Sequence, residues 1–320
     1  MKICIYGAGA MGTSLGWFLS DAPVDKLDLV TRNAAHVAAL NEGAALVGFE
    51  PPQSLHALLP EEMKERYDVI FLATKQRENA AIARFLKDYL VEDGALVTVQ
   101  NGLPEAGLAE VLGADRVYGC TLGWGAETIS PGVIRLTSAG ERHLAVGAYG
   151  RGERLEEIAE LFKWNFSVTV GNLAEIRYSK LVVNAAFSTL SAISGLTFGE
   201  LAKRHKRLVL SLMREVIEVA LAAGCKKLIQ NGHDILKLFK GPFASLILPV
   251  AMKKHRDITS GMLRDIAAGR RCDVDFVAGA VVAAGAKMGV PCPRLTRAIS
   301  LLHDIENGLA ELSPESLKLL

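Results

Sequence analysis

The stretch KICIYGAGAMGTSLGWFLSD, residues 2–21, decides the fold of the first part of the chain. Its first five residues are typical of a β-strand, the next six fit the pattern GxGxxG, and the remainder has the apolar spacing of a helix. Strand, glycine turn and helix in this order are the context in which GxGxxG marks a dinucleotide-binding turn. We therefore expect a parallel α/β sheet that binds a dinucleotide there. A glycine turn without a ligand is the alternative.

Each residue of this turn has an expected task in cofactor binding. Gly7 permits the tight turn, Gly9 lets the backbone approach a pyrophosphate, and Gly12 lets the helix pack against the strand. The phosphates would lie at the helix N-terminus, beside Ala10 and Met11, where unpaired N–H groups and the helix dipole favour anions.

The next predicted strand, KLDLVTR at 26–32, indicates which dinucleotide is bound. Sheets that bind NAD usually place an acid after this strand to accept from the ribose 2′-hydroxyl. Asp28 lies inside the strand and Arg32 follows it. Arginine can bind a 2′-phosphate through two parallel hydrogen bonds, which predicts NADPH/NADP+ as the cofactor. A surface arginine without this role is the alternative.

Two further apolar runs, 68–75 and 94–100, fit buried parallel strands. Lys75 ends the first and Asn101 follows the second. Because such sheets bind ligands at the carboxyl ends of their strands, both side chains are candidates for the site. Lys75 could equally be a solvated lysine, and Asn101-Gly102 a simple turn.

The rest of the chain completes two domains. Short runs with turns over 117–148 predict an antiparallel edge, and a helix over 153–164 and a strand over 167–171 close the first domain. Helical spacing then dominates. We expect an α/β Rossmann-like dinucleotide-binding domain over 1–170 and an all-α domain over 171–320, with helices in segments 173–193, 198–224, 255–268, 273–288 and 294–307.

Composition excludes several classes of function. With 320 residues, 50% hydrophobic and 22% charged, the chain is typical of a globular protein with two cores. Its net charge of +1, without a long basic run, predicts neither a nucleic acid nor a membrane as partner. Five scattered cysteines show no metal-ligand spacing, so no metal site is expected. Reduced thiols and the lack of a signal-like start favour the cytoplasm.

The segment RYSKLVVNAAFSTLSAISG, 177–195, reads as a helix that is apolar nearly all round. Lys180, Asn184 and Ser188 stand at positions i, i+4 and i+8, which lie along one side of an α-helix. A buried lysine is unfavourable unless it is paired or functional. These three side chains therefore form either a catalytic face or a structural one. In the structural alternative, the Lys180 ammonium reaches water from the helix start and Asn184 bonds to a neighbouring loop.

Taken together, these pieces resemble the ketopantoate reductase (2-dehydropantoate 2-reductase) family nearly end to end. The resemblance is carried by GAGAMG, the lysine of ATKQREN, VQNGL, KLVVNAAFSTLSA, SGMLRDIAAGRRCDVDFVAGAVV and GVPCP. Members of that family reduce ketopantoate to pantoate with NADPH, on the pathway to pantothenate and coenzyme A.

The resemblance implies roles for individual residues. Lys180 matches the catalytic lysine, Asn184 an asparagine of the same helix, and Asn101 the asparagine after the strand run. Lys75 matches a lysine at the cofactor, and Arg32 a basic residue at the 2′-phosphate.

Other positions depart from the family pattern. Ser188 stands where a second asparagine is usual, and Gly261 where a substrate-binding serine is usual, with Ser260 one residue earlier. Asp273 replaces a glutamate, and Glu78 a frequent glutamine. Asn101, Asn184, Ser188 and Ser260 are the resulting candidates for substrate binding. These departures leave the particular 2-oxo acid open.

The implied reaction transfers hydride from NADPH to C2 of a 2-oxo acid while Lys180 donates a proton. Asp273 could pair with Lys180 or accept from the substrate. Two alternatives remain: a reductase of the same fold for a different 2-oxo acid, and a non-catalytic NADPH-binding regulator. The expected partner is a small-molecule substrate, with a homodimer as an open alternative to a monomer.

Overall fold

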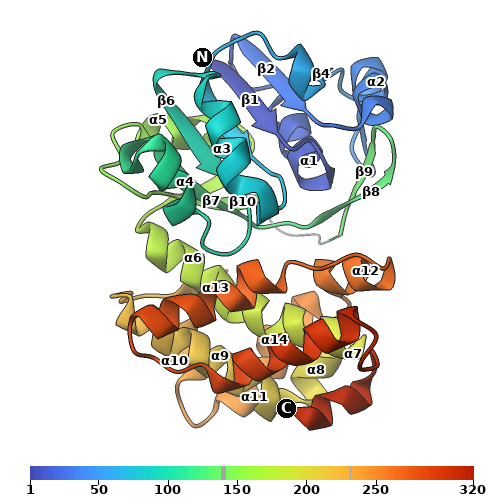
Figure 1. Cartoon of the computed structure of the whole chain (residues 1–320), viewed down its shortest axis with the longest axis vertical. Helices are drawn as coiled ribbons and strands as arrows, with labels where there is room; N and C mark the ends of the chain where they lie inside the picture. Colours follow the sequence, from blue (N-terminus) through green and yellow to red (C-terminus); the bar gives the residue numbers. More distant parts are fainter. Residues whose placement is uncertain (138–141, 231) are drawn as a thin grey trace. The chain divides into compact units, whose positions relative to one another are not determined.

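The chain forms two units, each with its own core. The computed structural model describes residues 1–137, 142–230 and 232–320. The first unit comprises Met1–Gln100 and Pro104–Leu173, and the second comprises Asn101–Leu103 and Ala174–Leu320 (Figure 1). The first contains the sheets and the second is mainly helical, which confirms the predicted fold class.

The first unit is built on an eight-stranded sheet with the order β11-β10-β7-β6-β5-β1-β2-β4. Six strands, from β4 to β7, run parallel, and the order reverses around β1, as in doubly wound nucleotide-binding sheets. Their bounds are β1 (Lys2–Tyr6), β2 (Lys26–Val30), β4 (His56–Leu58), β5 (Tyr67–Leu72), β6 (Leu90–Thr98), β7 (Val117–Leu122), β10 (His143–Ala148) and β11 (Ser167–Val170).

Alternation along β1 explains why both faces of this sheet are buried. Ile3 and Ile5 belong to one apolar cluster, together with Phe18, whereas Cys4 belongs to a second cluster with Leu86. The first cluster is covered by α1 (Ala10–Leu19) and α5 (Leu155–Lys163), and the second by α3 (Asn79–Lys87) and α4 (Glu105–Leu112). A parallel sheet covered in this way needs the continuous apolar runs seen in the sequence.

The predicted antiparallel edge over 117–148 is only partly correct. β7 continues the parallel sheet, whereas β10 runs antiparallel to β7, and β11 runs parallel to β10. The segment between them leaves the main sheet: β8 (Ala126–Ser130) and β9 (Val133–Leu136) form a hairpin. A strand that the sequence did not reveal, β3 (Ala45–Leu46), pairs with β9 in this second sheet. α2 (Ala34–Gly43) directly precedes β3.

The second unit is helical, but several of its helices are shorter than expected. Segment 198–224 opens with a capping box at Thr197 and Glu200, then breaks at His205. Segment 255–268 reduces to one short helix. The helices are α6 (Leu173–Val183), α7 (Thr189–Ser194), α8 (Phe198–Arg204), α9 (Lys206–Ala222), α10 (Ile235–Phe239), α11 (Ala244–Ala251), α12 (Gly261–Ala267), α13 (Val274–Lys287) and α14 (Pro293–Glu306), with a small hairpin of β12 (Ile229–Gln230) and β13 (His233–Asp234).

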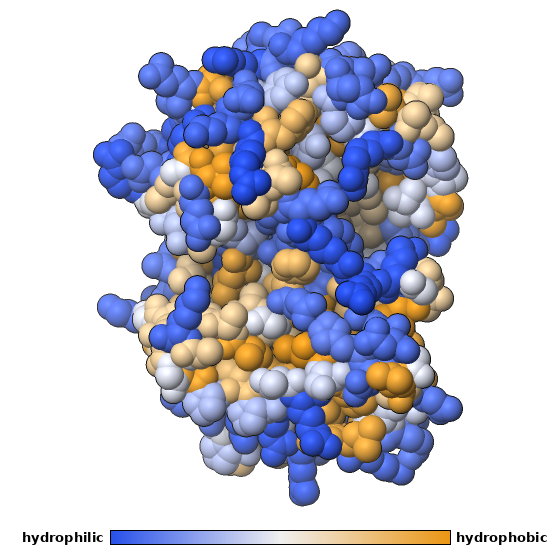
Figure 2. Space-filling view, viewed as in Figure 1, coloured by the Kyte–Doolittle hydropathy of each residue, from blue (hydrophilic) through white to orange (hydrophobic). Residues whose placement is uncertain are grey.

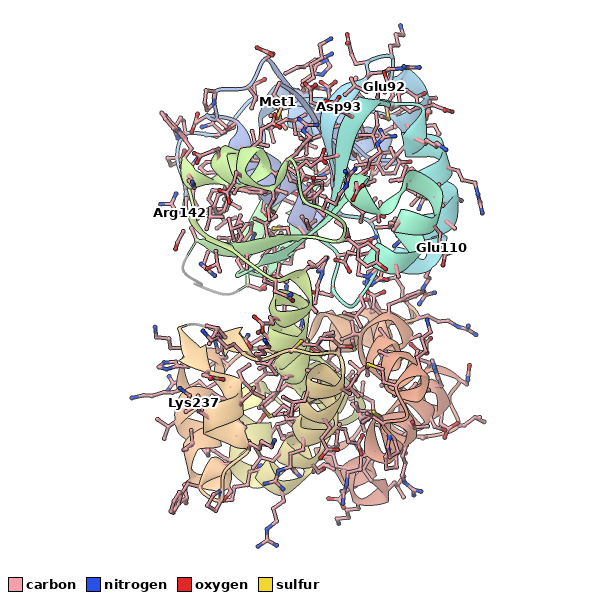
Figure 3. The ribbon with its side chains drawn as sticks, turned by 90° about the vertical axis from the view of Figure 1, so that its left-hand side faces the viewer. Met1, Glu92, Asp93, Glu110, Arg142 and Lys237 are labelled. Carbon is pink, nitrogen blue, oxygen red and sulfur yellow. The ribbon has the colours of Figure 1, made fainter. Side chains whose placement is uncertain are left out.

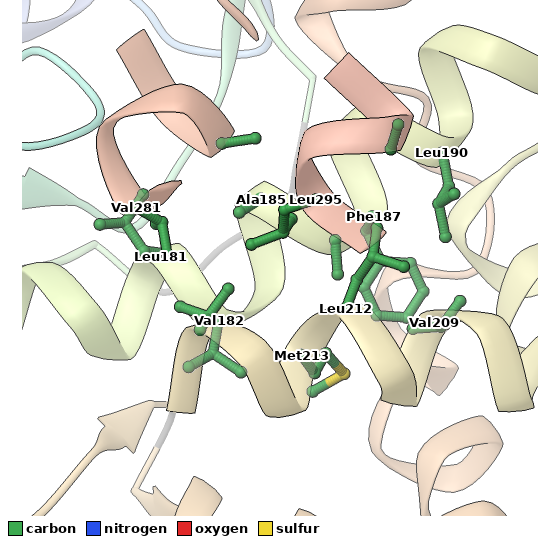
Figure 4. Close-up of a cluster of buried hydrophobic side chains, with 14 of the residues drawn as sticks. Leu181, Val182, Ala185, Phe187, Leu190, Val209, Leu212, Met213, Val281 and Leu295 are labelled. Atoms are coloured by element: carbon green, nitrogen blue, oxygen red, sulfur yellow. The ribbon is translucent and has the colours of Figure 1, made fainter. Parts of the chain in front are cut away.

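One apolar cluster joins these helices (Figure 4). Phe187 and Leu190 pack among side chains of α9, such as Leu212. The buried carboxylate of Glu215 on α9 accepts hydrogen bonds of 2.9 Å from the backbone N–H groups of Arg294 and Leu295, so it caps the start of α14. Packing thus holds the segment of Phe187 against α9, and the Glu215 cap joins α9 to α14.

Charged side chains occupy the outside of both units. Hydrophilic residues cover most of the face seen in Figure 2, with apolar residues interspersed. Glu92, Glu110 and Lys237 are exposed, and Figure 3 shows them on the surface. Arg142 places its guanidinium carbon 5.8 Å from the centre of the Phe18 ring.

Across the described residues, no single helix is both long and apolar enough to cross a membrane, and only one sharply bent pair, Leu173–Ser194 with Phe198–Arg204, meets those two criteria.

Candidate active site

The glycine turn adopts the arrangement that its sequence predicts. Gly7 has a φ of +102°, and a Cβ there would lie 2.6 Å from the backbone nitrogen of Thr74. A Cβ on Gly12 would lie 2.4 Å from the carbonyl oxygen of Gly7. Both positions therefore require glycine, the first for its conformation and for space, the second for close packing of α1 on β1.

Gly9 is different, because it faces open space. A Cβ added to Gly9 would meet no described atom within 4 Å. Gly9 is the N-cap of α1, so the N–H groups of Ala10 and Met11 open the helix. A backbone free of side chains at a helix N-terminus fits a pyrophosphate. These residues could hold a dinucleotide, and we keep them as its predicted ligands.

Asp28, the acid nearest to the expected ribose position, is engaged inside the sheet. It is fully buried, accepts a 2.6 Å hydrogen bond from the Tyr67 hydroxyl, and lies 2.6 Å from Nδ1 of His56. Burial and the hydrogen bond to Asp28 raise the pKa of Tyr67, which keeps that hydroxyl a donor. Asp28 is thus a structural partner of its neighbouring strands, as its position within the strand suggested.

Arg32 follows β2 and is an exposed cation at this corner of the sheet. Its guanidinium Nη1 lies 3.4 Å from Oε2 of Glu78, with 79% and 59% of the two side chains exposed. Lys75 is also exposed and directly precedes the short 3-10 helix Gln76–Glu78. The sheet topology thus brings Arg32, Glu78 and the glycine turn to the carboxyl ends of β2, β5 and β1, which are neighbouring strands.

A partly buried amide network, which sequence reasoning missed, fixes the ends of β5 and β6. Gln100 Nε2 donates to the carbonyl oxygen of Thr74 (2.8 Å) and to Oδ1 of Asn79 (2.8 Å). In return, Asn79 Nδ2 and the Thr98 hydroxyl each donate to Gln100 Oε1 at 3.0 Å. Two residues of this network, Thr74 and Gln100, directly precede Lys75 and Asn101. The only signal in the sequence is a polar residue directly before Asn101.

The helical segment of Lys180 has one partly exposed face. Between Ile176 and Ser194, only Lys180, Val183, Asn184 and Ser188 are half-buried, and every other residue is buried. The three predicted residues therefore share the accessible side of an otherwise buried segment. The catalytic role of this face stays a prediction.

The spacing predicted one regular α-helix, but the segment is interrupted. Residues Asn184–Ser188 form a π-helical turn between α6 and α7. Such wider turns occur frequently at functional sites because they redirect side chains. This one begins at Asn184 and ends at Ser188, so the irregularity coincides with two of the three candidates.

Ser260 serves as a buried cap. Its hydroxyl oxygen accepts from the backbone N–H of Leu263 at 3.0 Å, at the start of α12. Its own N–H donates to the Ser191 hydroxyl at 3.3 Å, which ties α12 to α7. Capping accounts for this serine, and its predicted role toward a substrate remains a prediction. Gly261 begins the helix.

Asp273 precedes α13 at the N-cap position. Among the described residues it makes no side-chain capping bond to that helix, and its Oδ1 is buried. Its loop is held elsewhere: the N–H of Cys272 donates to Glu306 Oε1 at 2.7 Å. His303 bridges Glu306 and Asp275, at 3.0 and 2.9 Å. Capping of α13 thus does not explain Asp273.

The candidates divide between the two units by role. The glycine turn, Arg32 and Lys75 lie in the sheet unit, whereas Lys180, Asn184, Ser188, Ser260 and Asp273 lie in the helical unit. Asn101, which follows β6, is grouped with the helical unit. In the described parts of both units, no group of three His, Cys, Asp or Glu side chains could hold a metal ion.

A doubly wound sheet with this glycine turn, followed by a helical unit, is typical of two-unit dinucleotide-dependent oxidoreductases. Family models agree. Residues 3–150 match the model of ketopantoate reductase PanE/ApbA, and residues 172–306 match the model of the ketopantoate reductase PanE/ApbA C terminal. The chain belongs to the ketopantoate reductase family of oxidoreductases.

Individual relatives share most of their length with this chain. The 2-dehydropantoate 2-reductase of Pyrococcus abyssi is 28% identical over 285 residues, which are 88% of this chain and 90% of that protein. The enzyme of the same name from Archaeoglobus fulgidus is 27% identical over 315 residues, or 96% of this chain and 99% of that protein.

Solved structures agree on the fold. The crystal structure of 2-dehydropantoate 2-reductase from Geobacter metallireducens is 25% identical, with a TM-score of 0.81 over 95% of this chain and 99% of that chain. A D-mandelate dehydrogenase solved with NADH and anilino(oxo)acetate is 22% identical, with a TM-score of 0.81 over 97% and 99% of the two chains. That second likeness shows the fold alone.

Proposed function

We propose that this protein reduces 2-dehydropantoate (ketopantoate) to pantoate with NADPH, as a step of pantothenate and coenzyme A biosynthesis. The observation that carries the proposal is the position of Lys180 on the accessible face of a buried helical segment, in a chain of the ketopantoate reductase family. Relatives named 2-dehydropantoate 2-reductase cover about nine tenths of the chain, which supports the same reaction here.

The sheet unit binds the cofactor in this proposal. The N–H groups of Ala10 and Met11 bind the pyrophosphate beside the open backbone of Gly9. Arg32 binds the 2′-phosphate, which selects NADPH over NADH. Lys75 adds positive charge at the end of β5. When bound, the cofactor supplies hydride to C2 of the oxo acid.

The helical unit supplies the acid and the substrate contacts. Lys180 donates its proton to the carbonyl oxygen, whose negative charge grows as C2 is reduced. Asn184 and Ser188, on the same face, and Asn101 orient the carboxylate and the carbonyl. Asp273 accepts from the substrate hydroxyl or from Lys180. Ser260, already the cap of α12, has its hydroxyl hydrogen left to donate to the substrate carboxylate.

A reductase of a different 2-oxo acid is the second candidate. Ser188, Gly261 and Asp273 are the observation that favours it, because each side chain is smaller than the one usual in the family. Smaller side chains leave room for a bulkier oxo acid or weaken the binding of ketopantoate.

Turnover of NADPH with a panel of 2-oxo acids tests both candidates. The purified protein is mixed with NADPH and ketopantoate, 2-oxoisovalerate, pyruvate or phenylglyoxylate, and cofactor absorbance is followed. We expect the highest kcat/KM with ketopantoate. A higher value with another acid would support the second candidate, and no oxidation with any acid would contradict both.

A further inference from the structure

His36 is a buried histidine for which the proposed mechanism has no use. It lies in the first turn of α2, four residues after Arg32, and only 4% of it is exposed. Both ring nitrogens have partners: Nε2 lies 3.1 Å from the hydroxyl of Thr13, and Nδ1 accepts from the N–H of Gly132 at 3.0 Å. Thr13 is also buried, and its hydroxyl donates to the carbonyl oxygen of Ala8 at 3.2 Å.

These contacts fix the protonation state of the ring. A backbone N–H can only donate, so Nδ1 of His36 must be the acceptor for Gly132 and carries no proton. The single ring proton is then on Nε2 and points at Thr13. Because the Thr13 hydroxyl gives its own hydrogen to Ala8, it accepts from Nε2. The contact from Gly132 therefore requires a neutral imidazole, which donates from Nε2 to Thr13.

His36 joins three separate segments of the sheet unit through its side chain and its backbone N–H. Ala8 and Thr13 belong to the glycine turn and to α1, which hold the pyrophosphate in the proposed function. The backbone N–H of His36 donates to Asn33 Oδ1 at 3.1 Å, so the residue also closes the corner that carries Arg32. Gly132 is the turn of the β8–β9 hairpin, with a φ of +76°.

We propose that neutral His36 is a positioning residue for dinucleotide binding, and that its protonation breaks the contact with Gly132, which releases the ring from its place beside Thr13, loosens the glycine turn and weakens the affinity for the cofactor. This inference rests on the proposed function only in requiring that the turn binds a nicotinamide dinucleotide.

Charge near His36 does not favour the protonated ring. α1 carries no charged residue, and on the β8–β9 hairpin Glu127 pairs with Arg135 at 3.3 Å. On the side of α2, Arg32 pairs with Glu78, and Glu42 lies at the far end of the helix. Among the described residues no carboxylate pairs with His36. Burial lowers its pKa, with a smaller opposing effect from the Ala8 backbone.

The direction of the pH effect follows from that shift. A histidine with a lowered pKa in the folded state is neutral at pH 7.5 and contributes its full stabilisation above its ordinary value of about 6.5. As the pH falls from 6.5 toward the lowered pKa, that contribution to stability is lost, and the folded protein gains the proton that weakens cofactor binding as the pH passes through the lowered pKa. A second proton on Nδ1 would point at the N–H of Gly132, donor against donor, so the contact to the hairpin would open.

Calorimetric titration with NADP+ between pH 7.5 and 5.0 tests the inference. The wild type is compared with His36→Gln, which cannot titrate but can still donate toward Thr13, and with His233→Gln, an exposed histidine of the helical unit, as control. Protonation of the cofactor affects all variants equally, so the difference between their pH profiles reports on the protein alone. Thr13→Val, which breaks the link to Ala8, is the second variant, and circular dichroism at pH 7.5 verifies folding.

Between pH 7.5 and 5.0, the affinity of the wild type and of His233→Gln for NADP+ should fall more than that of His36→Gln. We expect the extra loss to be about fivefold or more, a typical size for coupling between two sites. Thr13→Val should lose the extra dependence too. Parallel pH profiles in the wild type and in either folded variant would overturn the inference. No binding of NADP+ by the wild type at pH 7.5 would overturn the proposed function, and the inference with it.

Discussion

Nη1 of Arg32 lies 3.4 Å from Oε2 of Glu78, and this pair joins the ends of the two strands that flank β1. The contact is solvent-exposed and therefore weak. Its importance is its place, because a ribose bound at the glycine turn of a doubly wound sheet lies at this corner. A 2′-phosphate would have to replace Glu78 as the partner of Arg32.

Arg32 should determine the preference for NADPH. Arg32→Asp should weaken NADPH binding by about 10- to 100-fold, because one or two hydrogen bonds to a charged group are lost and a repulsion is added. NADH affinity should change little. Fluorescence titration with both cofactors measures the effect. Equal affinity for NADPH and NADH in the unaltered protein would contradict this role.

Glu78 should limit that preference. Glu78→Gln removes the competing carboxylate, so NADPH affinity should rise by about two- to fivefold, the size expected for a surface ion pair. The gain should shrink at high salt. Glu110→Gln, an exposed glutamate on α4, is the matched control. If Glu78→Gln leaves the ratio of NADPH to NADH affinity unchanged, Glu78 does not compete for Arg32.

Asp273 should matter for turnover rather than for folding. Because its side chain does not cap α13 among the described residues, Asp273→Asn should change the melting temperature little. The kcat for the preferred oxo acid should fall by about tenfold or more, since a charged partner of the substrate or of Lys180 is lost. Asp257→Asn, at a surface site, provides the control. Full activity of Asp273→Asn would remove Asp273 from the site.

His303 should make the stability of the helical unit depend on pH. Burial acts to lower its pKa, but hydrogen bonds to Glu306 and Asp275 outweigh that effect and raise it above the ordinary 6.5. A raised pKa gives stabilisation that is complete below pH 6.5 and is lost as the pH rises through the folded-state value.

Thermal melts should therefore show a fall in melting temperature from pH 6 to 8.5 that is smaller in His303→Gln. The control His233→Gln should follow the wild type. Identical pH profiles for His303→Gln and the wild type would show that the bridge from Glu306 to Asp275 contributes nothing.

The sheet unit could be predicted in outline because local patterns determine it. The apolar runs of β1, β5 and β6 and the spacing of Gly7 and Gly12 indicate a doubly wound sheet without knowledge of distant contacts. The second sheet could not be predicted in this way. β3 has two residues, and its pairing with β9 joins Ala45 to Val133, a contact that no local pattern reveals.

The same limit applies to the site. Sequence spacing placed Lys180, Asn184 and Ser188 on one side, and the structure places them on one accessible face, but the π-helical turn between them has no local signal. Gln100 and His36 look like ordinary polar residues in the sequence. Their partners, Asn79 and Thr13, are distant along the chain, so only the folded unit shows what they hold.

Lys180→Ala tests the central claim most directly. As the general acid, Lys180 should be worth about 10²–10⁴-fold in kcat, while NADPH affinity stays nearly unchanged, because its ammonium acts on charge that develops during reduction. Lys180→Arg should not restore the rate, since a guanidinium does not give up its proton near neutral pH. Lys237→Ala, an exposed lysine of the helical unit, is the control.

The decisive measurement is the kcat of folded Lys180→Ala with the best oxo acid, taken beside its melting temperature and its Kd for NADPH. We predict a kcat at least about 100-fold below that of the wild type and of Lys237→Ala, with the Kd retained. A Lys180→Ala protein that turns over at the wild-type rate and differs only in melting temperature would contradict the claim and leave Lys180 as a structural residue of its helix.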